Sequence, residues 1–249
     1  MLRRAVALGV DHIDTAAFYF SPLRSANELI NTALAPYPAD LVITTKVGPG
    51  RDSWGEWHWA RPDQLRGQVE ENLRQLGRNH LDVVNLRRRP NQESIAEHFG
   101  ALAKLREAGL IRHLGISDVT PTQLAEARVI APVAAVQNRF GLGHRGATEV
   151  LRECGQAGIA FVPFSAIAGA RASGAALDPT ISEEGTELLT VAKAHGATPE
   201  QIRLAWTLAQ GAHVLAISGT GDPAHLEANV AAGAIRLTRD DLMVLEPAV

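Results

Sequence analysis

Residues 113–137, HLGISDVTPTQLAEARVIAPVAAVQ, contain the unit that decides the fold. The unit opens and closes with short apolar runs of strand length, His113–Ser117 and Ala134–Gln137. Between them, Thr120-Pro121 puts a capping hydroxyl directly before a proline at the first helical position. The order is therefore strand, helix, strand, and a helical crossover of this kind joins parallel strands.

The same alternation extends over the rest of the chain, where runs rich in Val and Ile are followed by stretches of helical period. It predicts strands at His12–Asp14, Leu41–Lys46, Leu81–Leu86, His113–Ser117, Ala134–Gln137, Ala160–Phe164 and Val214–Ile217. It predicts helices at Ser25–Ala35, Pro62–Leu76, Ser94–Ala108, Pro121–Ile130, Ala147–Ala157, Glu183–His195, Pro199–Gln210, Ala224–Ala232 and Arg239–Leu245. The pattern indicates an α/β protein, either a doubly wound sheet or a (β/α)8 barrel, and in both folds the carboxyl ends of the strands face the ligand.

The composition is that of a soluble protein with a sizeable core, because 46% of the 249 residues are apolar and 20% are charged. We expect a single domain over residues 1–249, since α/β barrels of about 250 residues form one unit. The net charge of -3 offers no positive field to a nucleic acid, and no apolar run reaches the ~20 residues of a membrane span. The lone Cys154 favours a reduced, cytoplasmic location. We therefore expect neither nucleic acid nor membrane as a partner.

Polar side chains lie at or just beyond the ends of the first three predicted strands: Asp14 with Tyr19, then Lys46, then Arg87. An ammonium that is held by a carboxylate stabilises a phenolate, so a tyrosine beside it can donate a proton to a carbonyl oxygen. A salt bridge that caps a strand, with an ordinary aromatic residue beside it, fits the same spacing. The spacing alone leaves both interpretations open.

Further motifs occur in a fixed order along the chain. They are Asp14-Thr15-Ala16 with Tyr19, Thr45-Lys46, Gly115-Ile116-Ser117-Asp118, Val136-Gln137, and Ile217 with Gly219-Thr220, His225 and Asn229. In this order they resemble the aldo-keto reductase family. The resemblance implies a (β/α)8 TIM barrel that binds NADPH and transfers hydride to an aldehyde or ketone.

The resemblance also implies roles for individual residues. Tyr19 would donate the proton, and Asp14 and Lys46 would assist its ionisation. The nicotinamide would be held through its amide by Ser117, Asp118 and Gln137. The remaining cofactor contacts would come from Phe164, which stacks on the nicotinamide ring, and from Ser165, Ile167, Gly219, Thr220, His225 and Asn229, which line the pyrophosphate and adenosine. No metal is implied.

Three positions depart from the family pattern. Arg87 stands where the family usually has a catalytic histidine, and a guanidinium can hold a substrate carbonyl or an anionic group but cannot relay a proton. Asp118 replaces a common asparagine, and Ala228 replaces a glutamate that often contacts adenine. The preference for NADPH rests on the resemblance alone, because Asp222 supplies an acid near the expected ribose phosphate and only His225 could oppose it. NADH therefore stays open as a cofactor.

The amino-terminal end departs as well, since family members place a barrel strand and its helix before the strand that ends in Asp14. Only residues 1–8 are available for that helix, so the first barrel strand is missing from the prediction. An open barrel leaves unpaired strand edges. We expect that the true start lies upstream, or that a partner segment or an altered closure fills the gap.

The segment Leu81–Arg87 is similar to a bacterial branch of the family that includes pyridoxal reductases. It suggests an enzyme that reduces a small aromatic aldehyde such as pyridoxal with NADPH. One alternative is a reductase-like binding or regulatory subunit with impaired catalysis. Another is a lyase or aldolase that uses Lys46 as a Schiff-base amine. The cluster Trp54, Trp57 and Trp59 is predicted on a loop that either stacks on a flat substrate or packs its own aromatic rings, and a homo-oligomer is left open.

Overall fold

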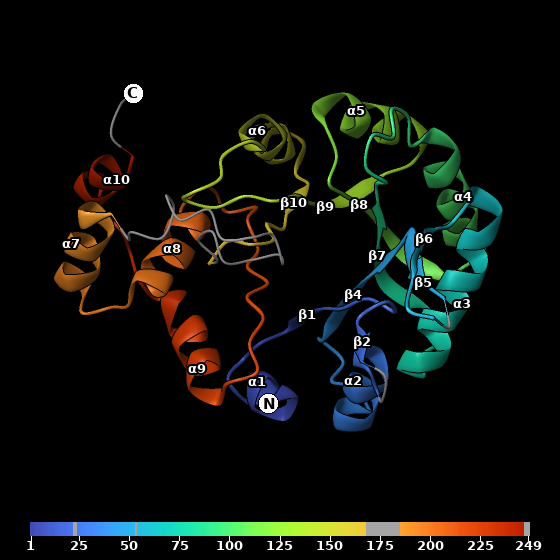
Figure 1. Ribbon diagram of the computed structural model, residues 1–249, viewed down its shortest axis with the longest axis horizontal. Coiled ribbons are helices and arrows are strands. Elements are labelled where there is room, and N and C mark those ends of the chain that lie inside the picture. Colours follow the sequence, from blue (N-terminus) through green and yellow to red (C-terminus); the bar gives the residue numbers. More distant parts are fainter. Residues whose placement is uncertain (22–23, 53, 168–184, 247–249) are drawn as a thin grey trace. The chain divides into compact units, whose positions relative to one another are not determined.

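The computed structural model describes residues 1–21, 24–52, 54–167 and 185–246 (Figure 1). The chain forms two compact units, which we call the N-terminal unit, Leu2–Gln137, and the C-terminal unit, Asn138–Val249. Within the described ranges, no helix is long and apolar enough to cross a membrane. The expectation of a single domain stays a prediction.

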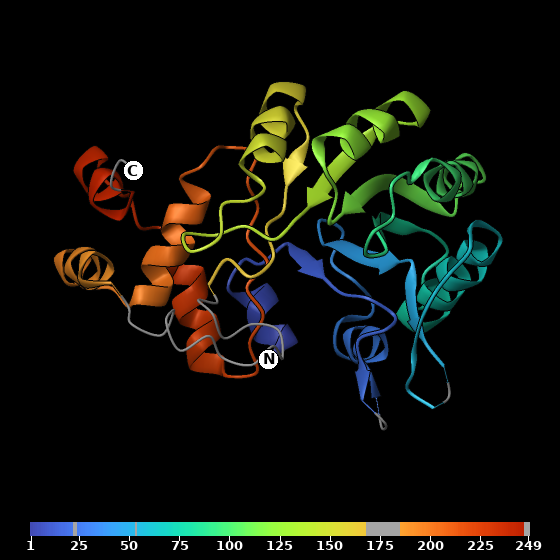
Figure 2. The same cartoon turned by 45° about the horizontal axis from the view of Figure 1, so that its top comes forward.

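A parallel sheet forms the centre of the N-terminal unit, with neighbouring strands in the order β1-β4-β7-β8-β9. These strands are β1 His12–Asp14, β4 Val42–Val47, β7 Leu81–Arg87, β8 Ile111–Ser117 and β9 Val133–Gln137. The helices of the unit are α1 Leu2–Ala7, α2 Ala26–Leu34, α3 Leu65–Leu76 (after the 3-10 turn η1 Pro62–Gln64), α4 Ala96–Glu107 and α5 Pro121–Ile130. Figures 1 and 2 show α3, α4 and α5 along one face of this sheet. Parallel strands covered by helices are the arrangement that the sequence pattern predicts.

The two faces of this sheet differ in chemistry. The face toward the helices is buried and mostly apolar, and includes Ile43, Val84 and Ile116, with the hydroxyl of Thr45 as a polar exception. Side chains alternate along a strand, so the opposite face carries the other set of positions, among them Lys46 and Asn85, which are paired in register. The core of the unit therefore lies between sheet and helices, while polar groups gather on the other face.

The C-terminal unit is mainly helical. It comprises α6 Thr148–Ala157, β10 Ala160–Phe161, α7 Thr186–His195, α8 Pro199–Leu208, α9 Pro223–Ala232 and α10 Arg239–Leu245. Its core contains the fully buried Trp206, whose ring stacks on Phe140 at a centroid distance of 5.6 Å, and Phe161, which meets Phe140 edge-on at 5.7 Å. Helices α7, α8 and α9 pack in sequence, and α10 packs against α7.

The helix boundaries follow local signals in the sequence. Thr120 accepts a hydrogen bond from the Gln123 N–H and Thr198 accepts one from the Gln201 N–H, so both predicted capping boxes form. Gly77, directly after α3, has a φ of +63°, a left-handed conformation that a residue with a side chain adopts at a cost. These signals explain why the predicted helices begin and end close to the observed positions.

Two predicted strands are shorter than expected. The strand at 160–164 is reduced to Ala160–Phe161, and no named strand covers 214–217 in the described structure, where Val214 forms only an isolated bridge with Phe161. An apolar run can be buried without a ladder of hydrogen bonds on both sides, and the sequence does not distinguish the two situations. The prediction of a strand at Val214–Ile217 is therefore wrong.

Two short antiparallel pairs are absent from the prediction: β2 Phe20–Ser21 with β3 Arg24–Ser25, and β5 Pro49–Arg51 with β6 Trp57–Trp59. The second pair contains part of the tryptophan cluster. Trp57 meets Phe18 at a centroid distance of 5.8 Å, and the Arg51 guanidinium lies 4.2 Å from the Trp57 ring centroid. Trp54 is largely exposed. These contacts are of the kind expected if the loop packs its own aromatic rings, the second of the two alternatives given above.

Strand β1 ends the strand order of the N-terminal unit and is paired there with β4. The helix that precedes it, α1, is short and is followed by a left-handed Gly9 with a φ of +90°. That a partner segment or an altered closure covers the other edge of β1 stays a prediction.

Candidate active site

The candidate catalytic residues share one face of the sheet in the N-terminal unit. Strand register pairs Lys46 with Asn85, Arg87 with Ser117, and Ser117 with Gln137. Because Asn85 and Arg87 are two residues apart on β7, their side chains point to the same side. The register thus brings polar residues from neighbouring strands together at the carboxyl ends of β4, β7, β8 and β9.

Lys46 and Asp14 form a buried ion pair. The Lys46 ammonium donates to Asp14 Oδ1 and, at 3.1 Å, to the Thr15 carbonyl. Gln137 Nε2 donates to Asp14 Oδ2 at 2.8 Å, so both carboxylate oxygens have a partner. The side chains of Lys46 and Asp14 are only 5% and 11% exposed. Charges withdrawn from water to this extent need partners of opposite charge with good geometry, and this pair has them.

Tyr19 lies beside this pair. The Lys46 Nζ atom is 4.8 Å from the centroid of the Tyr19 ring, and Phe18 meets the same ring edge-on at 5.1 Å. The loop is fixed by the Tyr19 N–H, which donates to the Ala16 carbonyl at 3.0 Å. Tyr19 is 45% exposed, so one side of the phenol faces the ammonium while another is accessible to a substrate.

Arg87 is held at the end of β7 by two partners. Its Nη1 donates to Ser117 Oγ at 3.2 Å, and its Nη2 lies 3.4 Å from Asp118 Oδ2. Asp118 has a φ of +63°, and Arg88 donates to its carbonyl through Nε while Arg88 Nη2 lies 3.8 Å from Asp118 Oδ2. Asp118 is therefore an acidic partner of Arg87.

Arg88 and Asn85 are two residues of this region that the sequence analysis did not single out. The run of three arginines at 87–89 resembles a solvated basic loop, and its contacts with the carbonyl and carboxylate of Asp118 distinguish Arg88. Asn85 is fully buried, and neither atom of its side-chain amide has a partner among the described residues. Its position on the polar face of β7, next to Lys46 in register, is the signal that could have identified it.

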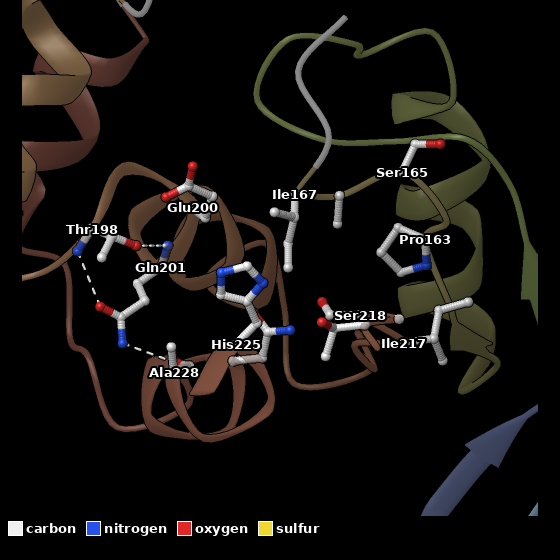
Figure 3. Close-up of a pocket in the computed structure, with 14 residues that line it drawn as sticks. Pro163, Ser165, Ile167, Thr198, Glu200, Gln201, Ile217, Ser218, His225 and Ala228 are labelled. Carbon is white, nitrogen blue, oxygen red and sulfur yellow. Dashed lines mark hydrogen bonds between the residues drawn. The ribbon is translucent and has the colours of Figure 1, made fainter. Parts of the chain in front are cut away.

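A second group of candidate residues lines a pocket in the C-terminal unit, with a volume of about 500 Å³ (Figure 3). The pocket is bordered by six of the residues that the resemblance assigns to the cofactor, namely Ser165, Ile167, Gly219, Thr220, His225 and Asn229. Phe164 does not line it. The Phe164 backbone instead donates to the Asn138 carbonyl at 3.0 Å and accepts from the Phe140 N–H at 3.3 Å.

The chemistry of this pocket fits a nucleotide. His225 and Asn229 are four residues apart on α9 and therefore lie on the same face of the helix. A Cβ atom placed on Gly219 or Gly221 would meet no heavy atom within 4 Å, so the backbone of this loop can be approached closely. Ser218 Oγ lines the pocket, is buried and has no partner among the described residues. A bound group with polar atoms would satisfy this hydroxyl.

The described lining of the pocket has little positive charge for a site that would hold the ribose phosphate of NADPH. Glu200 contributes a carboxylate, and among the described lining residues only His225 can become positively charged. Asp222 lies outside the lining set and caps α9 by accepting from the Ala224 N–H at 2.8 Å. The sequence predicts that Asp222 opposes a ribose phosphate. In the structure the Asp222 carboxylate instead caps α9.

Comparisons with known proteins place these observations in a family. The model of the aldo/keto reductase family matches residues 1–247. The chain is similar to pyridoxine 4-dehydrogenase of Escherichia coli, with 40% identity over 253 residues, which cover 99% of this chain and 84% of that protein. An uncharacterized oxidoreductase of Schizosaccharomyces pombe is 38% identical over 240 residues, which cover 96% of this chain and 74% of that protein.

Solved structures of aldo-keto reductases are also similar to this chain. A thermostable aldo-keto reductase in complex with the inhibitor epalrestat matches with a TM-score of 0.81 and 30% identity, over 98% of this chain and 84% of the other. An aldo-keto reductase from Klebsiella pneumoniae in complex with NADPH matches with a TM-score of 0.81 and 26% identity, over 98% of this chain and 81% of the other. The chain has the α/β TIM-barrel fold of these proteins and belongs to the aldo/keto reductase family.

Proposed function

We propose that this protein is an NADPH-dependent oxidoreductase that reduces an aldehyde or ketone to an alcohol. The observation that carries the proposal is the approach of the Lys46 ammonium to the Tyr19 ring, 4.8 Å from its centroid, with Asp14 paired to the same ammonium. A salt bridge that merely capped a strand would not require a half-exposed phenol beside it. Family membership supports the same activity.

In the proposed mechanism, bound NADPH supplies the hydride that the carbonyl carbon accepts. The Tyr19 hydroxyl donates its proton to the carbonyl oxygen. The Lys46 ammonium stabilises the phenolate that remains, and the ion pair with Asp14 holds Lys46 in place. Arg87, oriented by Ser117, contributes positive charge near the oxygen but transfers no proton.

The resemblance implies two sets of cofactor contacts, one within each unit. The pyrophosphate and adenosine would contact the residues of the pocket in the C-terminal unit, including Gly219, Thr220 and Asn229. The nicotinamide amide would contact Ser117, Asp118 and Gln137, with Phe164 stacked on the ring. The scarcity of positive charge in the described pocket lining leads us to expect turnover with NADH as well as with NADPH.

Pyridoxal is the first substrate to test, because the Escherichia coli relative is named a pyridoxine 4-dehydrogenase. Its aldehyde is attached to a flat aromatic ring, in line with the sequence-based expectation of a small aromatic aldehyde. We propose a cytoplasmic location, supported by the buried thiol of Cys154, and we leave the homo-oligomer as a prediction.

The first experiment follows NADPH absorbance with pyridoxal and with a panel of other aldehydes and ketones, in wild type and Tyr19→Phe. We expect Tyr19→Phe to lower kcat at least a hundredfold, on the order of the contribution of general acid catalysis, with little change in the Kd of NADPH. Equal loss of turnover and of cofactor affinity would contradict the role of Tyr19. Tight NADPH binding by wild type without oxidation by any carbonyl compound would favour the alternative, a reductase-like subunit without catalysis.

A further inference from the structure

Two buried asparagines lie between the helices and the sheet of the N-terminal unit, behind the ion pair of Lys46 and Asp14. Asn27 is on α2 and Asn72 is on α3, and we call them the amide pair. Asn27 Nδ2 donates to Asn72 Oδ1 at 2.9 Å, so the two side chains are bonded to each other. Both are fully buried.

The amide pair accepts hydrogen bonds from two threonine hydroxyls. Thr15 Oγ1 donates to Asn27 Oδ1 at 2.8 Å, and Thr45 Oγ1 donates to Asn72 Oδ1 at 2.5 Å. Both threonines are buried as completely as the asparagines. Thr15 directly follows Asp14 in the chain, and Thr45 directly precedes Lys46. The amide pair is therefore attached to the chain neighbour of each member of the ion pair.

The contact of Thr15 with Lys46 gives this attachment a consequence for the site. The Thr15 carbonyl accepts from the Lys46 ammonium at 3.1 Å, and the Thr15 N–H donates to the Thr44 carbonyl at 2.8 Å. Movement of Thr15 would thus take one acceptor away from the ammonium and shift the adjacent Asp14. Because Lys46 is buried, a lost partner is not replaced by water at no cost.

Packing alone does not account for these polar groups. The other buried residues of the same helices are apolar, such as Ile30 on α2 and Val69 on α3, except Gln75, which bonds to Asn27. A buried amide costs free energy unless its hydrogen bonds are satisfied, and satisfied networks fix one arrangement of the groups they join. The further bonds of Asn27 to Gln75 Oε1 at 3.0 Å and of Asn72 Nδ2 to the Gln68 carbonyl at 2.8 Å complete the network.

We propose that the amide pair Asn27–Asn72 positions the Lys46–Asp14 ion pair for catalysis by holding the hydroxyls of Thr15 and Thr45 from the outer side of the sheet. These residues are positioning residues, because none of them is placed at the reacting atoms. The inference rests on the proposed reductase function for its kinetic readout, but the position of Lys46 can also be measured without turnover.

The test uses Thr15→Val and Thr45→Val, which remove one hydroxyl each and keep the shape of the side chain. We expect each variant to lower kcat about tenfold, the effect of one lost hydrogen bond to the network, with an unchanged KM for the carbonyl compound. In parallel, the full-length protein is treated with an amine-reactive label, and the labelling rate of Lys46 is followed by peptide mass spectrometry. We expect faster labelling of Lys46 in both variants, because the ammonium is held less firmly.

Two further variants provide the comparison. Thr15→Ser keeps the hydroxyl and is expected to recover most of the rate. Thr207→Val removes an equally buried hydroxyl, bonded at 2.9 Å to the Arg203 carbonyl in the C-terminal unit, and controls for a general loss of stability.

Wild-type kcat and wild-type labelling of Lys46 in both valine variants would overturn the proposal, as would an equal fall of kcat in Thr207→Val. If wild type itself shows no turnover, the proposed function fails, while the labelling rates still decide whether the amide pair holds Lys46.

Discussion

The charged groups of the candidate catalytic cluster and the polar groups of the pocket in the C-terminal unit are organised in different ways, although the neutral amide of Asn85 beside Lys46 also has no partner among the described residues. In the N-terminal unit, the charged side chains of the candidate catalytic cluster already have partners: Lys46 bonds to Asp14, Asp14 accepts from Gln137, and Arg87 donates to Ser117. In the pocket of the C-terminal unit, Ser218 Oγ has no partner among the described residues, and the glycines leave the backbone accessible. The difference indicates a catalytic cluster that the protein prepares by itself and a binding pocket that a ligand completes.

The largest effect is expected from removal of the central positive charge of the candidate catalytic cluster. Lys46→Met leaves the Asp14 carboxylate buried without its ion-pair partner, and loss of one partner from a buried pair costs about 3 kcal/mol or more of stability. We expect kcat to fall about a thousandfold or more, since the phenolate of Tyr19 loses its stabilising charge. Steady-state kinetics and urea unfolding of the same preparation measure both effects.

A suitable control for Lys46→Met is the double variant with Asp14→Asn, in which no unpaired charge remains buried. This double variant should recover part of the stability but none of the turnover. Recovery of turnover with stability would show that the pair is structural only.

In the C-terminal unit the expected effect is smaller and falls on a different constant. Asn229→Ala removes one polar group from a pocket that we expect to bind the cofactor, so the KM of NADPH should rise about tenfold while kcat stays near its wild-type value. Glu149→Ala, on α6 outside the pocket lining, serves as the matched surface variant. A fall in kcat without a change in KM would place Asn229 in the chemical step and contradict the division between the units.

The smallest expected effect is on the stability of the protein in mild acid, and it concerns His12 in the N-terminal unit. Burial lowers the pKa of His12 below its ordinary value of 6.5, although Asp14 and Asp11 nearby raise it. The folded protein thus favours the neutral ring, and His12 contributes stability that is present above pH 6.5 and is lost as the pH falls below it. We expect Tm to drop by a few degrees between pH 7 and about pH 5.5.

His12→Gln should reduce this pH dependence, because glutamine can still bond Thr44, whose Oγ1 lies 2.8 Å from His12 Nε2, and carries no titratable ring. Differential scanning calorimetry at both pH values compares the two proteins. An identical drop in wild type and His12→Gln would assign the acid sensitivity to other groups.

In the C-terminal unit, by comparison, the Asp241 carboxylate loses its contribution to folding stability only at much lower pH. Burial would raise the pKa of Asp241, but hydrogen bonds from His195 and Thr238 outweigh it and hold the pKa below its ordinary value of 3.8. The stability that Asp241 contributes is present above that value and is lost as the pH falls further. As the pH falls, the contribution of His12 should therefore be lost before that of Asp241.

The sequence predicts the sheet of the N-terminal unit well, because its strands are short runs of β-branched residues between helices with clear caps such as Thr120-Pro121. It does not predict the pair β5–β6, whose stabilising contact between Phe18 and Trp57 joins residues far apart in the chain. The strand predicted at 214–217 does not form either, because only Val214 of this run pairs with Phe161.

The candidate site shows the same limit. Asp14, Lys46 and Arg87 are predictable because they lie at or next to the carboxyl ends of strands, and parallel strands bring these ends together. Asn27 and Asn72 are not predictable in this way: they lie on amphipathic helices, where a polar residue usually faces solvent, and their mutual bond spans 45 positions. Only the three-dimensional structure shows that they face inward.

The contact between Arg87 and Asp118 has a consequence for protein engineering. Exchanging Arg87 for the histidine that the resemblance leads us to expect there would leave the Asp118 carboxylate with the more distant Arg88, 3.8 Å away, and would remove the donor to Ser117 Oγ. We therefore expect the effects of substitutions at the two positions to depend on each other, so that Arg87→His is best combined with Asp118→Asn.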